Sequence, residues 1–457
     1  MIKKFSAPRG TTDILPDEIF LWQTIETTSR HTLGLYGFRE IRTPIFEESN
    51  LFARSLGQAS DVVQKQMLNL ASVKLEADAM EKESGLSLRP EATASIVRSY
   101  IQNNFAKKES LSKLYYIGAM FRGERPQKGR LRQFHQIGVE AIGPNSTTPY
   151  LDAEVISLSI RLLQEFGITG FKLKINSLGS PEDKKNFSKV LRDLLKKEVS
   201  KLCEDCQQRF ERNVFRILDC KNEDCKRIVK GLSLNDSHLS KESQKYFLEV
   251  KGALKILNVS FEVSPYLVRG LDYYTHTVFE ISHESLGSQD ALGAGGRYNG
   301  LVAELGGDEQ GNIGAIGFAL GMERIILAKK EIEKRQSGGG VIPPESIASL
   351  SADKAGGITP PLDVFIVSLD QPDENKAYIT AFKLLNEIRL TGLSAEMAYT
   401  KASMKSQMRL ADKLCAKRVI LIGENELKEN SVTLKDMKTG EQTKISSNKI
   451  SEILKQS

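Results

Sequence analysis

Basic, aromatic and acidic side chains alternate closely in residues 121–140, FRGERPQKGRLRQFHQIGVE. An apolar segment (113–120) precedes them, and this pattern predicts two antiparallel strands joined by a basic Pro/Gly loop. Because strand side chains alternate between faces, two sets should each share one face: Arg122 and Glu124, and Arg132, Phe134, Gln136 and Glu140. An arginine, an aromatic platform and a deep carboxylate on one sheet surface suit a nucleotide lying beside a small polar molecule.

The segment 86–93, LSLRPEAT, ends a predicted strand and begins a predicted helix over 92–102. Its Arg89-Pro90-Glu91 stands at the junction. An acidic residue and a threonine at a helix start are often caps for the free amide groups. The position of the segment before the basic hairpin favours ligand binding as well, and both interpretations stay open on these residues alone.

A dense polar and aromatic group lies in residues 267–280, LVRGLDYYTHTVFE, within a stretch (261–281) that resumes the strand pattern. Its members are Arg269, Asp272, Tyr273, Tyr274 and His276. Buried tyrosine hydroxyls need partners, so the group forms either a satisfied core network or the wall of a pocket.

The small-residue segment 313–323 predicts a strand that leads into a helix carrying Arg324, which could grip phosphates or form an ion pair. The Gly-rich segment 292–300, LGAGGRYNG, does not complete GxGxxG, and Rossmann and P-loop sites are disfavoured.

Four of the five cysteines are close in sequence, in the order Cys203-x2-Cys206 and Cys220-x4-Cys225. Two close pairs with a short separation match the spacing of a structural Zn²⁺ site. The alternative is four reduced thiols. Cys415 lies far from the others and is predicted to be a core residue.

The composition is that of a soluble globular protein. The 457 residues carry a net charge of +6, with 40% hydrophobic and 27% charged residues. This mildly basic balance permits a nucleic-acid partner without requiring one. No apolar run approaches about 20 residues, and the start MIKKFSAPRG lacks a signal-peptide core. We therefore expect a cytoplasmic protein without a membrane partner.

Changes in composition and in predicted secondary structure along the chain predict its domains. A helix over about 18–36 and a strand over 38–46 carrying Pro44 open a first domain, 1–335, in which 74–84 is a solvated excursion. Residues 184–230 hold 14 Lys/Arg against 8 Asp/Glu, and this strand-poor stretch predicts a helical insertion over 179–253. A Gly/Pro-rich linker over 336–361 follows. The βαβ alternation beyond it predicts a small α/β domain over 362–457. Its residues Lys401, Lys405 and Arg409 line the approach to one helix face, which is either a solvated surface or a contact for nucleic acid.

Several long segments together resemble one family. FRGERPQKGRLRQFHQIGVE resembles motif 2 of the class II aminoacyl-tRNA synthetases, GFREIRTPIFEE resembles motif 1 with a dimer-interface proline at Pro44, and IGFALGMER resembles motif 3. LVRGLDYYTHTVFE and LRPEAT resemble the histidine motifs of the histidyl-tRNA synthetases. KASMKSQMRLADKLCAKRVILIG resembles the anticodon-binding domain of that family. The resemblance covers almost the whole chain in the right order.

The resemblance implies an α/β (α+β) fold: an antiparallel-sheet catalytic core with a helical insertion, plus a small α/β anticodon-binding domain. It implies a homodimeric ligase that activates L-histidine with ATP and Mg²⁺ and transfers it to the histidine tRNA. The catalytic residues would be Arg269, Arg122 and Arg324. The ATP site would comprise Arg122, Glu124, Phe134 and Arg324, and the histidine site Glu91, Ala92, Thr93, Gln136, Glu140, Tyr273 and Tyr274.

The sequence departs from the family motifs at three positions. Ala92 replaces the glycine of RPEGT, Gly123 stands where a larger residue is common, and Asn299 replaces the aspartate of GGRYDG. These departures bear on contact geometry rather than on function. Two alternatives are a regulatory subunit of ATP phosphoribosyltransferase, and an RNA-binding or signalling protein with a degenerate synthetase domain. The complete set of ligand residues and the additional domain favour the enzyme over both.

Overall fold

The computed structural model describes residues 5–58, 60–70, 85–308, 310–336, 361–371, 374–450 and 453–454. Contacts divide the chain into two units, one of residues 1–26 and 40–331 and one of residues 27–39 and 332–457. The predicted excursion 74–84 and the predicted linker, apart from its two end residues, lie outside the described residues. No helix among the described residues is long and apolar enough to cross a membrane.

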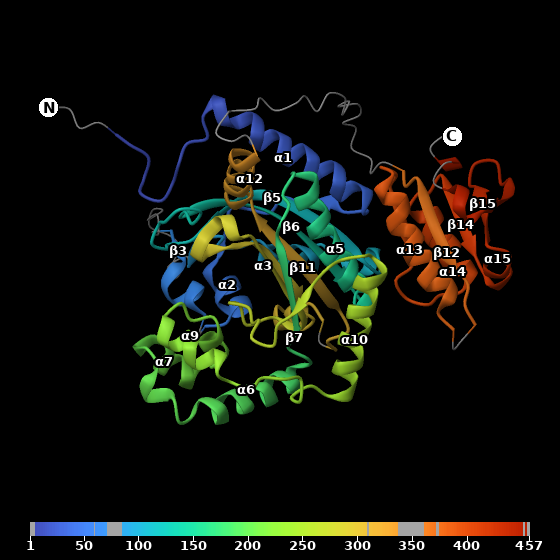
Figure 1. Ribbon diagram of the computed structural model, residues 1–457. Helices are drawn as coiled ribbons and strands as arrows, with labels where there is room; N and C mark the ends of the chain where they lie inside the picture. Colours follow the sequence, from blue (N-terminus) through green and yellow to red (C-terminus); the bar gives the residue numbers. More distant parts are fainter. Residues whose placement is uncertain are drawn as a thin grey trace, which may run out of the picture. The chain divides into compact units, whose positions relative to one another are not determined.

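A mainly antiparallel sheet forms the centre of the first unit (Figure 1). Within the described residues its strand order is β1-β5-β6-β11-β10-β9-β7-β8. Neighbouring strands from β5 to β7 are antiparallel, and β7 and β8 are parallel. The strands are β1 (Arg39–Glu40), β5 (Ser112–Phe121), β6 (Gln133–Gly143), β7 (Lys172–Ser177), β8 (Glu262–Val263), β9 (Thr275–Ser282), β10 (Ala291–Arg297) and β11 (Gly314–Gly321). The predicted antiparallel core is confirmed.

Small residues in the middle of this sheet leave room for large polar side chains. Gly317 of β11 lies directly opposite Glu140 of β6. A Cβ atom on Gly317 would collide with the Glu140 carboxylate, and one on Gly138 would collide with the Tyr116 ring. Glycine at these two positions therefore allows a buried carboxyl group and a phenol to lie flat against the sheet.

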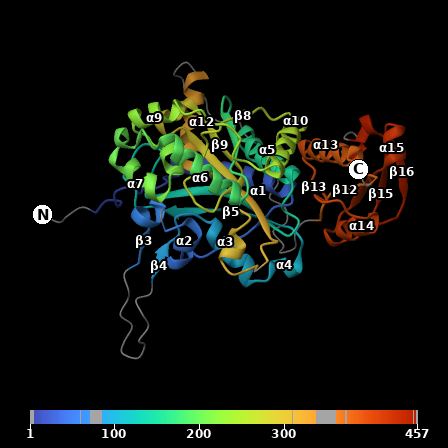
Figure 2. The same ribbon diagram turned by 90° about the horizontal axis from the view of Figure 1, so that it is seen from below.

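Helices cover the sheet and a small accessory sheet lies beside it (Figures 1 and 2). The helices are α1 (Pro16–Leu35), α2 (Ser49–Leu56), α3 (Thr93–Gln102), α4 (Phe105–Lys108), α5 (Pro149–Glu165), α10 (Lys241–Ile256), α11 (Leu301–Glu304) and α12 (Met322–Gln336), with a short π-helix η1 (Val62–Gln66) and 3-10 turn η3 (Glu284–Gln289). The accessory sheet has the order β2 (Phe46–Glu48), β4 (Leu86–Leu88) and β3 (Leu68–Asn69). The predicted single strand over 38–46 is wrong, because β1 and β2 are separate strands in different sheets. Pro44 lies in the irregular segment between them, where its missing N–H breaks no ladder.

The insertion is helical, as its composition predicted. It contains α6 (Pro181–Leu195), the 3-10 turn η2 (Val199–Lys201), α7 (Glu204–Arg212), α8 (Phe215–Leu218) and α9 (Glu223–Lys230). Helix α6 begins with a capping box between Ser180 and Asp183. The Asp183 carboxylate also accepts hydrogen bonds from Ser240 N (2.8 Å) and Ser243 Oγ (2.5 Å), which ties α6 to α10.

The second unit contains a five-stranded sheet among its described residues, in the order β13-β12-β14-β15-β16. Its elements are β12 (Val364–Ser368), α13 (Lys376–Leu390), β13 (Ala395–Met397), α14 (Met404–Lys413), β14 (Arg418–Ile422), α15 (Glu424–Lys428), β15 (Ser431–Asp436), β16 (Gln442–Ser446) and the 3-10 turn η4 (Ser447–Lys449). Strand β12 is parallel to β13 and β14, as the βαβ pattern predicted. The prediction that Cys415 is a core residue is wrong: it is exposed, with φ of 51° in the turn after α14.

Candidate active site

A cavity of about 210 Å³ opens where the β5–β6 hairpin, the β4–α3 junction, the loop before β9 and the β11–α12 junction meet. It collects residues that span more than two hundred positions of sequence. Eleven of the predicted site residues line it: Glu91, Thr93, Arg122, Glu124, Phe134, Gln136, Glu140, Arg269, Tyr273, Tyr274 and Arg324. Ala92 is buried beside the cavity but is not among its lining residues.

Strand β6 of the hairpin presents the predicted face to the cavity. Its partner, strand β5, ends earlier than predicted. Phe134, Gln136 and Glu140 alternate along β6 and all reach the cavity. Arg122 and Glu124 lie beyond the end of β5, since the next amide, Gly123 N, donates to Gln66 O (2.6 Å) instead of to β6. Arg132 is not in the cavity lining; its Nε donates to Glu124 O (3.2 Å).

Three arginines form one end of the cavity, and each is held by a neighbouring oxygen. Arg122 Nε donates to Pro90 O (2.9 Å), and its guanidinium lies 5.2 Å from the centre of the Phe134 ring. Arg324 donates to two backbone carbonyls, at 3.0 and 2.6 Å, and Arg269 Nη1 donates to Glu280 Oε2 (2.7 Å). Burial lowers the pKa of Arg122 and of Arg324, but a guanidinium stays charged at any ordinary pH.

Glu124 is the carboxylate of this end. It pairs closely with Arg130 and lies 3.9 Å from Arg122 Nη1. Arg130 also lines the cavity, and sequence reasoning had assigned it only to the basic loop. The carboxylate is thus oriented by two arginines before any ligand binds.

A second part of the cavity, here called the carboxyl end, is built around the buried carboxyl group of Glu140. Thr93 Oγ1 donates to Glu140 Oε1 (2.6 Å), and Tyr298 donates from its hydroxyl to Glu140 Oε2. Burial raises the pKa of Glu140 to about 8, although both hydrogen bonds act in the opposite direction. The nearby Glu91 and the rings of Tyr273 and Tyr274 complete this end.

Glu91 performs the capping role that its position at a helix start suggested. Its two oxygens accept hydrogen bonds from Thr93 N (2.7 Å) and Ala94 N (3.0 Å). It also lines the cavity, so the capping and the ligand-binding interpretations describe the same side chain. The cap holds the carboxylate in place, which is what a binding residue needs.

Two buried side-chain atoms at the cavity have no hydrogen-bond partner among the described residues. They are Gln136 Oε1 and Arg269 Nε. Buried polar atoms are rarely left unpaired. Gln136 and Arg269 therefore each keep one buried polar atom without a partner in this arrangement of the side chains.

Sequence reasoning missed two tyrosines of the cavity, Tyr298 and Tyr116. Tyr298 follows Arg297 at the end of β10, and its place in the GGRYNG segment was a usable signal. Tyr116 lies in the apolar strand β5, where an inward-facing tyrosine looks like an ordinary core residue.

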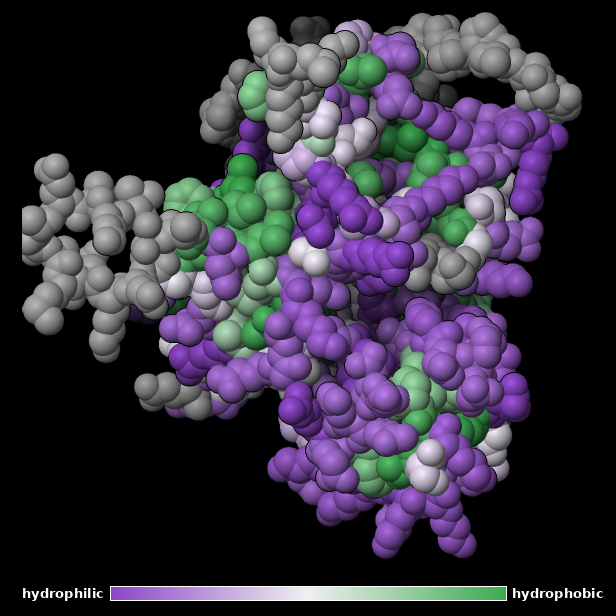
Figure 3. All heavy atoms as spheres, turned by 90° about the vertical axis from the view of Figure 1, so that its left-hand side faces the viewer, coloured by the Kyte–Doolittle hydropathy of each residue, from purple (hydrophilic) through white to green (hydrophobic). Residues whose placement is uncertain are grey.

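The four clustered cysteines lie outside this cavity, in the insertion. Their sulfur atoms are within 4.8 Å of one another. Figure 3 shows the side of the molecule that carries β3 and the insertion helices as mainly hydrophilic, with separate hydrophobic patches. The cluster itself is largely shielded from solvent, since Cys206 and Cys225 are fully buried.

Comparison with known proteins relates both units to described families. Residues 10–325 match the family model "Histidyl-tRNA synthetase", and residues 363–457 match "Anticodon binding domain". The histidine–tRNA ligase of Halothermothrix orenii is 42% identical over 441 residues, which are 96% of each chain. The histidine–tRNA ligase of Bacillus subtilis is 40% identical over 454 residues, 99% of this chain and 98% of that one. The crystal structure of the apo S. aureus histidyl-tRNA synthetase matches all of both chains with 35% identity and a TM-score of 0.54.

Proposed function

The chain belongs to the histidyl-tRNA synthetase family, and we propose that the cavity described above carries out both steps of histidine–tRNA ligation. First, a carboxylate oxygen of L-histidine attacks the α-phosphorus of ATP, bound as its Mg²⁺ complex, and pyrophosphate leaves. Second, the terminal ribose hydroxyl of the histidine tRNA attacks the carbonyl carbon of the adenylate, loses its proton and displaces AMP. The observation that carries the proposal is one cavity with three arginines at one end and a buried carboxyl, amide and tyrosine group at the other.

The arginine end receives the triphosphate. We assign Arg122 and Arg269 to opposite sides of the α-phosphate, and Arg324 to the γ-phosphate. Their existing bonds to carbonyl and carboxylate oxygens fix the direction of each guanidinium. Donors fixed in advance stabilise the charge that develops on the phosphoryl oxygens without reorganising during the reaction. Arg269 would then assist attack where other class II enzymes use a further metal ion.

The adenine lies on the Phe134 ring in this proposal. Arg122 already lies over that ring, so the base and the α-phosphate would share one support. Glu124 accepts a hydrogen bond from the adenine amino group. Its pairing with Arg130 keeps the carboxylate turned toward the cavity while it does so.

The carboxyl end recognises histidine. A neutral imidazole has one N–H donor and one acceptor nitrogen, so its site must supply both partners. Glu140 accepts the ring N–H and Tyr273 serves the second nitrogen. Glu91, Thr93 and Gln136 meet the α-amino and carboxylate groups, while Tyr274 closes the wall. A site of paired polar groups rejects amino acids that leave them unsatisfied.

The tRNA contacts both units in this proposal. A second hollow, lined by Lys65, Arg125, Gln127 and others, shares Glu124 and Arg130 with the main cavity. We assign it to the acceptor end of the tRNA, whose phosphates suit basic side chains. In the second unit, the exposed side chains Lys401, Lys405 and Arg409 would contact the anticodon arm.

We further propose a cytoplasmic homodimer, with Pro44 at the subunit boundary. Its domains would be a catalytic domain over 1–335 with the insertion 179–253, a linker over 336–361 and an anticodon-binding domain over 362–457. The matched segments 10–325 and 363–457 support this division. Light scattering of the purified protein gives its mass in solution, and a monomeric mass at assay concentration would contradict the dimer.

The test of the proposed function is histidine-dependent exchange of pyrophosphate into ATP. We expect exchange with L-histidine, and none when histidine is omitted or replaced by another amino acid. Exchange requires only the first step, so it tests the cavity without the tRNA. A protein that binds histidine but exchanges with no amino acid would overturn the assignment and favour a regulatory role.

A further inference from the structure

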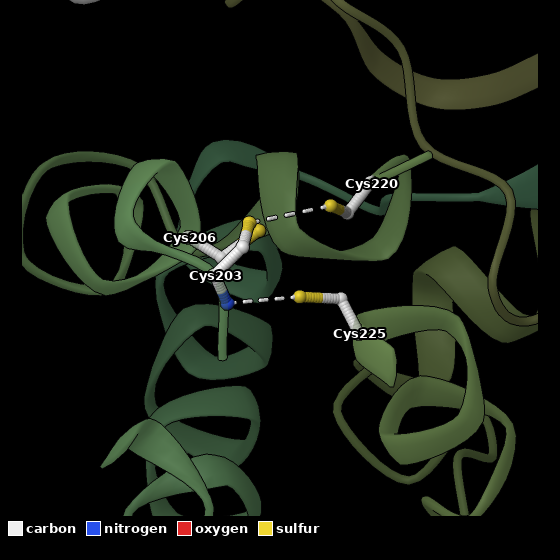
Figure 4. Close-up of side chains that lie close together, drawn as sticks. All are labelled: Cys203, Cys206, Cys220 and Cys225. Carbon is white, nitrogen blue, oxygen red and sulfur yellow. Dashed lines mark hydrogen bonds between the residues drawn. The ribbon is translucent and has the colours of Figure 1, made fainter. Parts of the chain in front are cut away.

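We propose that Cys203, Cys206, Cys220 and Cys225 bind one Zn²⁺ ion as a structural site within the helical insertion. The four side chains point toward one another from separate segments (Figure 4). Cys203 precedes α7, Cys206 lies in its first turn, Cys220 follows α8, and Cys225 lies in α9. The proposal depends on these residues alone and does not rest on the proposed function.

The spacing of the sulfur atoms suits a tetrahedral ion. A Zn–S bond of about 2.3 Å places two sulfur ligands about 3.8 Å apart across a tetrahedron. Cys203 Sγ and Cys220 Sγ are 3.8 Å apart, and all four sulfur atoms lie within 4.8 Å of one another. A disulfide would need about 2.0 Å, and all four cysteines are free. The sulfur atoms are therefore arranged around a common centre rather than joined in pairs.

The ligand set indicates the metal and its role. Four thiolates without an imidazole, a carboxylate or an open position are typical of a structural Zn²⁺ site rather than a catalytic one. Within the described residues, the group contains only the four cysteines. Cys206 and Cys225 are fully buried and Cys220 is 8% exposed, so the centre is largely shielded from water.

Nearby donors would offset the excess negative charge of four thiolates on a divalent ion. Cys203 N donates to Cys225 Sγ at 3.2 Å, and this bond is drawn in Figure 4. Arg209 Nη1 lies 4.0 Å from Cys206 Sγ. Groups of this kind orient metal ligands and stabilise their ionised forms.

The bound ion would hold together helices that are too short to be stable alone. Helix α8 spans Phe215–Leu218 and α9 spans Glu223–Lys230. Isolated helices of this length are marginal in water. Where a metal site forms only in the folded chain, the free energy of metal binding contributes directly to folding.

The segment between these helices in turn contacts the loop that carries two cavity tyrosines. Asn213 Nδ2, between α7 and α8, donates to Asp272 Oδ1 (2.7 Å), and Asp272 directly precedes the cavity tyrosines Tyr273 and Tyr274. Arg209 and Arg216 both pair with Asp61, at 3.0 and 2.7 Å. The metal site would thus fix the part of the insertion that docks on the cavity loop.

The first experiment measures metal in the wild-type chain, purified without a polyhistidine tag and under reducing conditions. After dialysis against a weak chelator, we expect one zinc per chain by elemental analysis. A mercurial thiol reagent should release it into a metal-indicating dye. Replacement by Co²⁺ should give the visible bands of a tetrahedral ion and a thiolate charge-transfer band. Reduced protein without stoichiometric metal, or cobalt bands of six-coordinate geometry, would overturn the proposal.

The second experiment compares cysteine variants. Cys206→Ser and Cys225→Ser should lose the metal and lower the melting temperature, whereas Cys415→Ser, the exposed cysteine of the second unit, should retain both. If a variant fails to fold, the wild-type cobalt spectrum and thiol-reagent release still decide the question. Wild-type metal content in both variants, or a native disulfide found by alkylation and mass spectrometry, would contradict the site.

Discussion

The two ends of the cavity hold their charged groups in different ways. At the arginine end, Arg122 and Arg324 donate to backbone carbonyl oxygens. At the carboxyl end, Glu140 is held by the hydroxyl groups of Thr93 and Tyr298. Two of the three arginines are thus held by the main chain, and Arg269 by the Glu280 carboxylate, whereas Glu140 is held by side-chain hydroxyl groups alone.

This difference separates a permanent charge from a titrating one. A guanidinium remains protonated throughout the ordinary pH range. Burial brings the pKa of Glu140 to about 8, so its charge changes near neutral pH. We therefore expect the arginine end to set the rate of the chemical step, and the carboxyl end to set histidine recognition and its pH dependence.

The largest effect should come from Arg269→Ala. Removing one fixed donor from a developing charge slows a reaction by about 10²- to 10³-fold. We expect a loss of this size in the rate of adenylate formation, with a much smaller change in histidine affinity. Rapid-quench measurement of adenylate formation and equilibrium binding of histidine give the two quantities separately.

The matched control for this variant is Arg227→Ala, which removes a surface arginine of α9 whose side chain is 80% exposed. It should leave both the rate and the affinity unchanged. Equal losses of rate and affinity in Arg269→Ala would mean that Arg269 contributes uniform binding. This result would contradict the proposal that the arginine end sets the rate of the chemical step and the carboxyl end sets histidine recognition.

For Glu140→Gln we expect a smaller effect, which falls on histidine affinity rather than on the rate of adenylate formation. A hydrogen bond to a charged partner contributes about 1.5–3 kcal/mol, or about a ten- to hundredfold change in affinity. We expect histidine binding to weaken by this amount while ATP binding is retained. Glu165→Gln, on the surface of α5, is the matched control. Weaker ATP binding with unchanged histidine affinity would reverse the assignment of the two ends.

The pH dependence of histidine binding tests the titrating group directly. In the free cavity Glu140 is mainly protonated below its pKa of about 8. If the ionised form accepts the imidazole N–H, binding releases a proton and affinity rises with pH until about 8, by at most about tenfold per pH unit. Calorimetric titrations at several pH values measure this slope. A flat profile between about pH 7 and 8, where histidine is already neutral, would contradict the role of an ionised Glu140.

The sequence predicted the hairpin because its signal is local, whereas the other cavity residues were assigned through the resemblance to the family motifs. Two-residue alternation placed Phe134, Gln136 and Glu140 on one face of β6, and the structure places them there. The end of β5 could not be predicted, since it depends on the bond from Gly123 N to the distant Gln66 O. A hydrogen-bond partner that is far away in sequence does not change the alternation of residue types along the strand, so this alternation cannot reveal it.

The contact between Tyr298 and Glu140 could not be predicted for the same reason. The Tyr298 hydroxyl reaches Glu140 only because β10 and β6 both flank β11, and because Gly317 leaves the space open. The four cysteines show the converse case. Their spacing within 23 residues was enough to suggest a common site, and their sulfur atoms do converge. In Cys415 the same kind of reasoning failed, because a lone cysteine carries no spacing signal.

The smallest effect is expected for Tyr298→Phe, which tests a single hydrogen bond at the carboxyl end. The substitution removes one donor to Glu140 and leaves the ring in place. An ordinary hydrogen bond contributes about 0.5–1.5 kcal/mol, so histidine affinity should fall by about two- to tenfold. Tyr266→Phe removes a comparable bond, to Leu232 O (2.8 Å), and should leave histidine affinity unchanged.

The direction of the accompanying pKa change distinguishes a positioning role for Tyr298 from a merely structural one. The Tyr298 hydroxyl stabilises the ionised form of Glu140 and lowers its pKa against the larger effect of burial. In Tyr298→Phe the pKa of Glu140 should therefore rise further, and the midpoint of the histidine-binding profile should move to higher pH. Loss of affinity without this movement would mean that Tyr298 supports only the shape of the cavity. A shift of the midpoint to lower pH would mean that Glu140 is not the titrating group, because removing a donor from a carboxylate cannot make it more acidic.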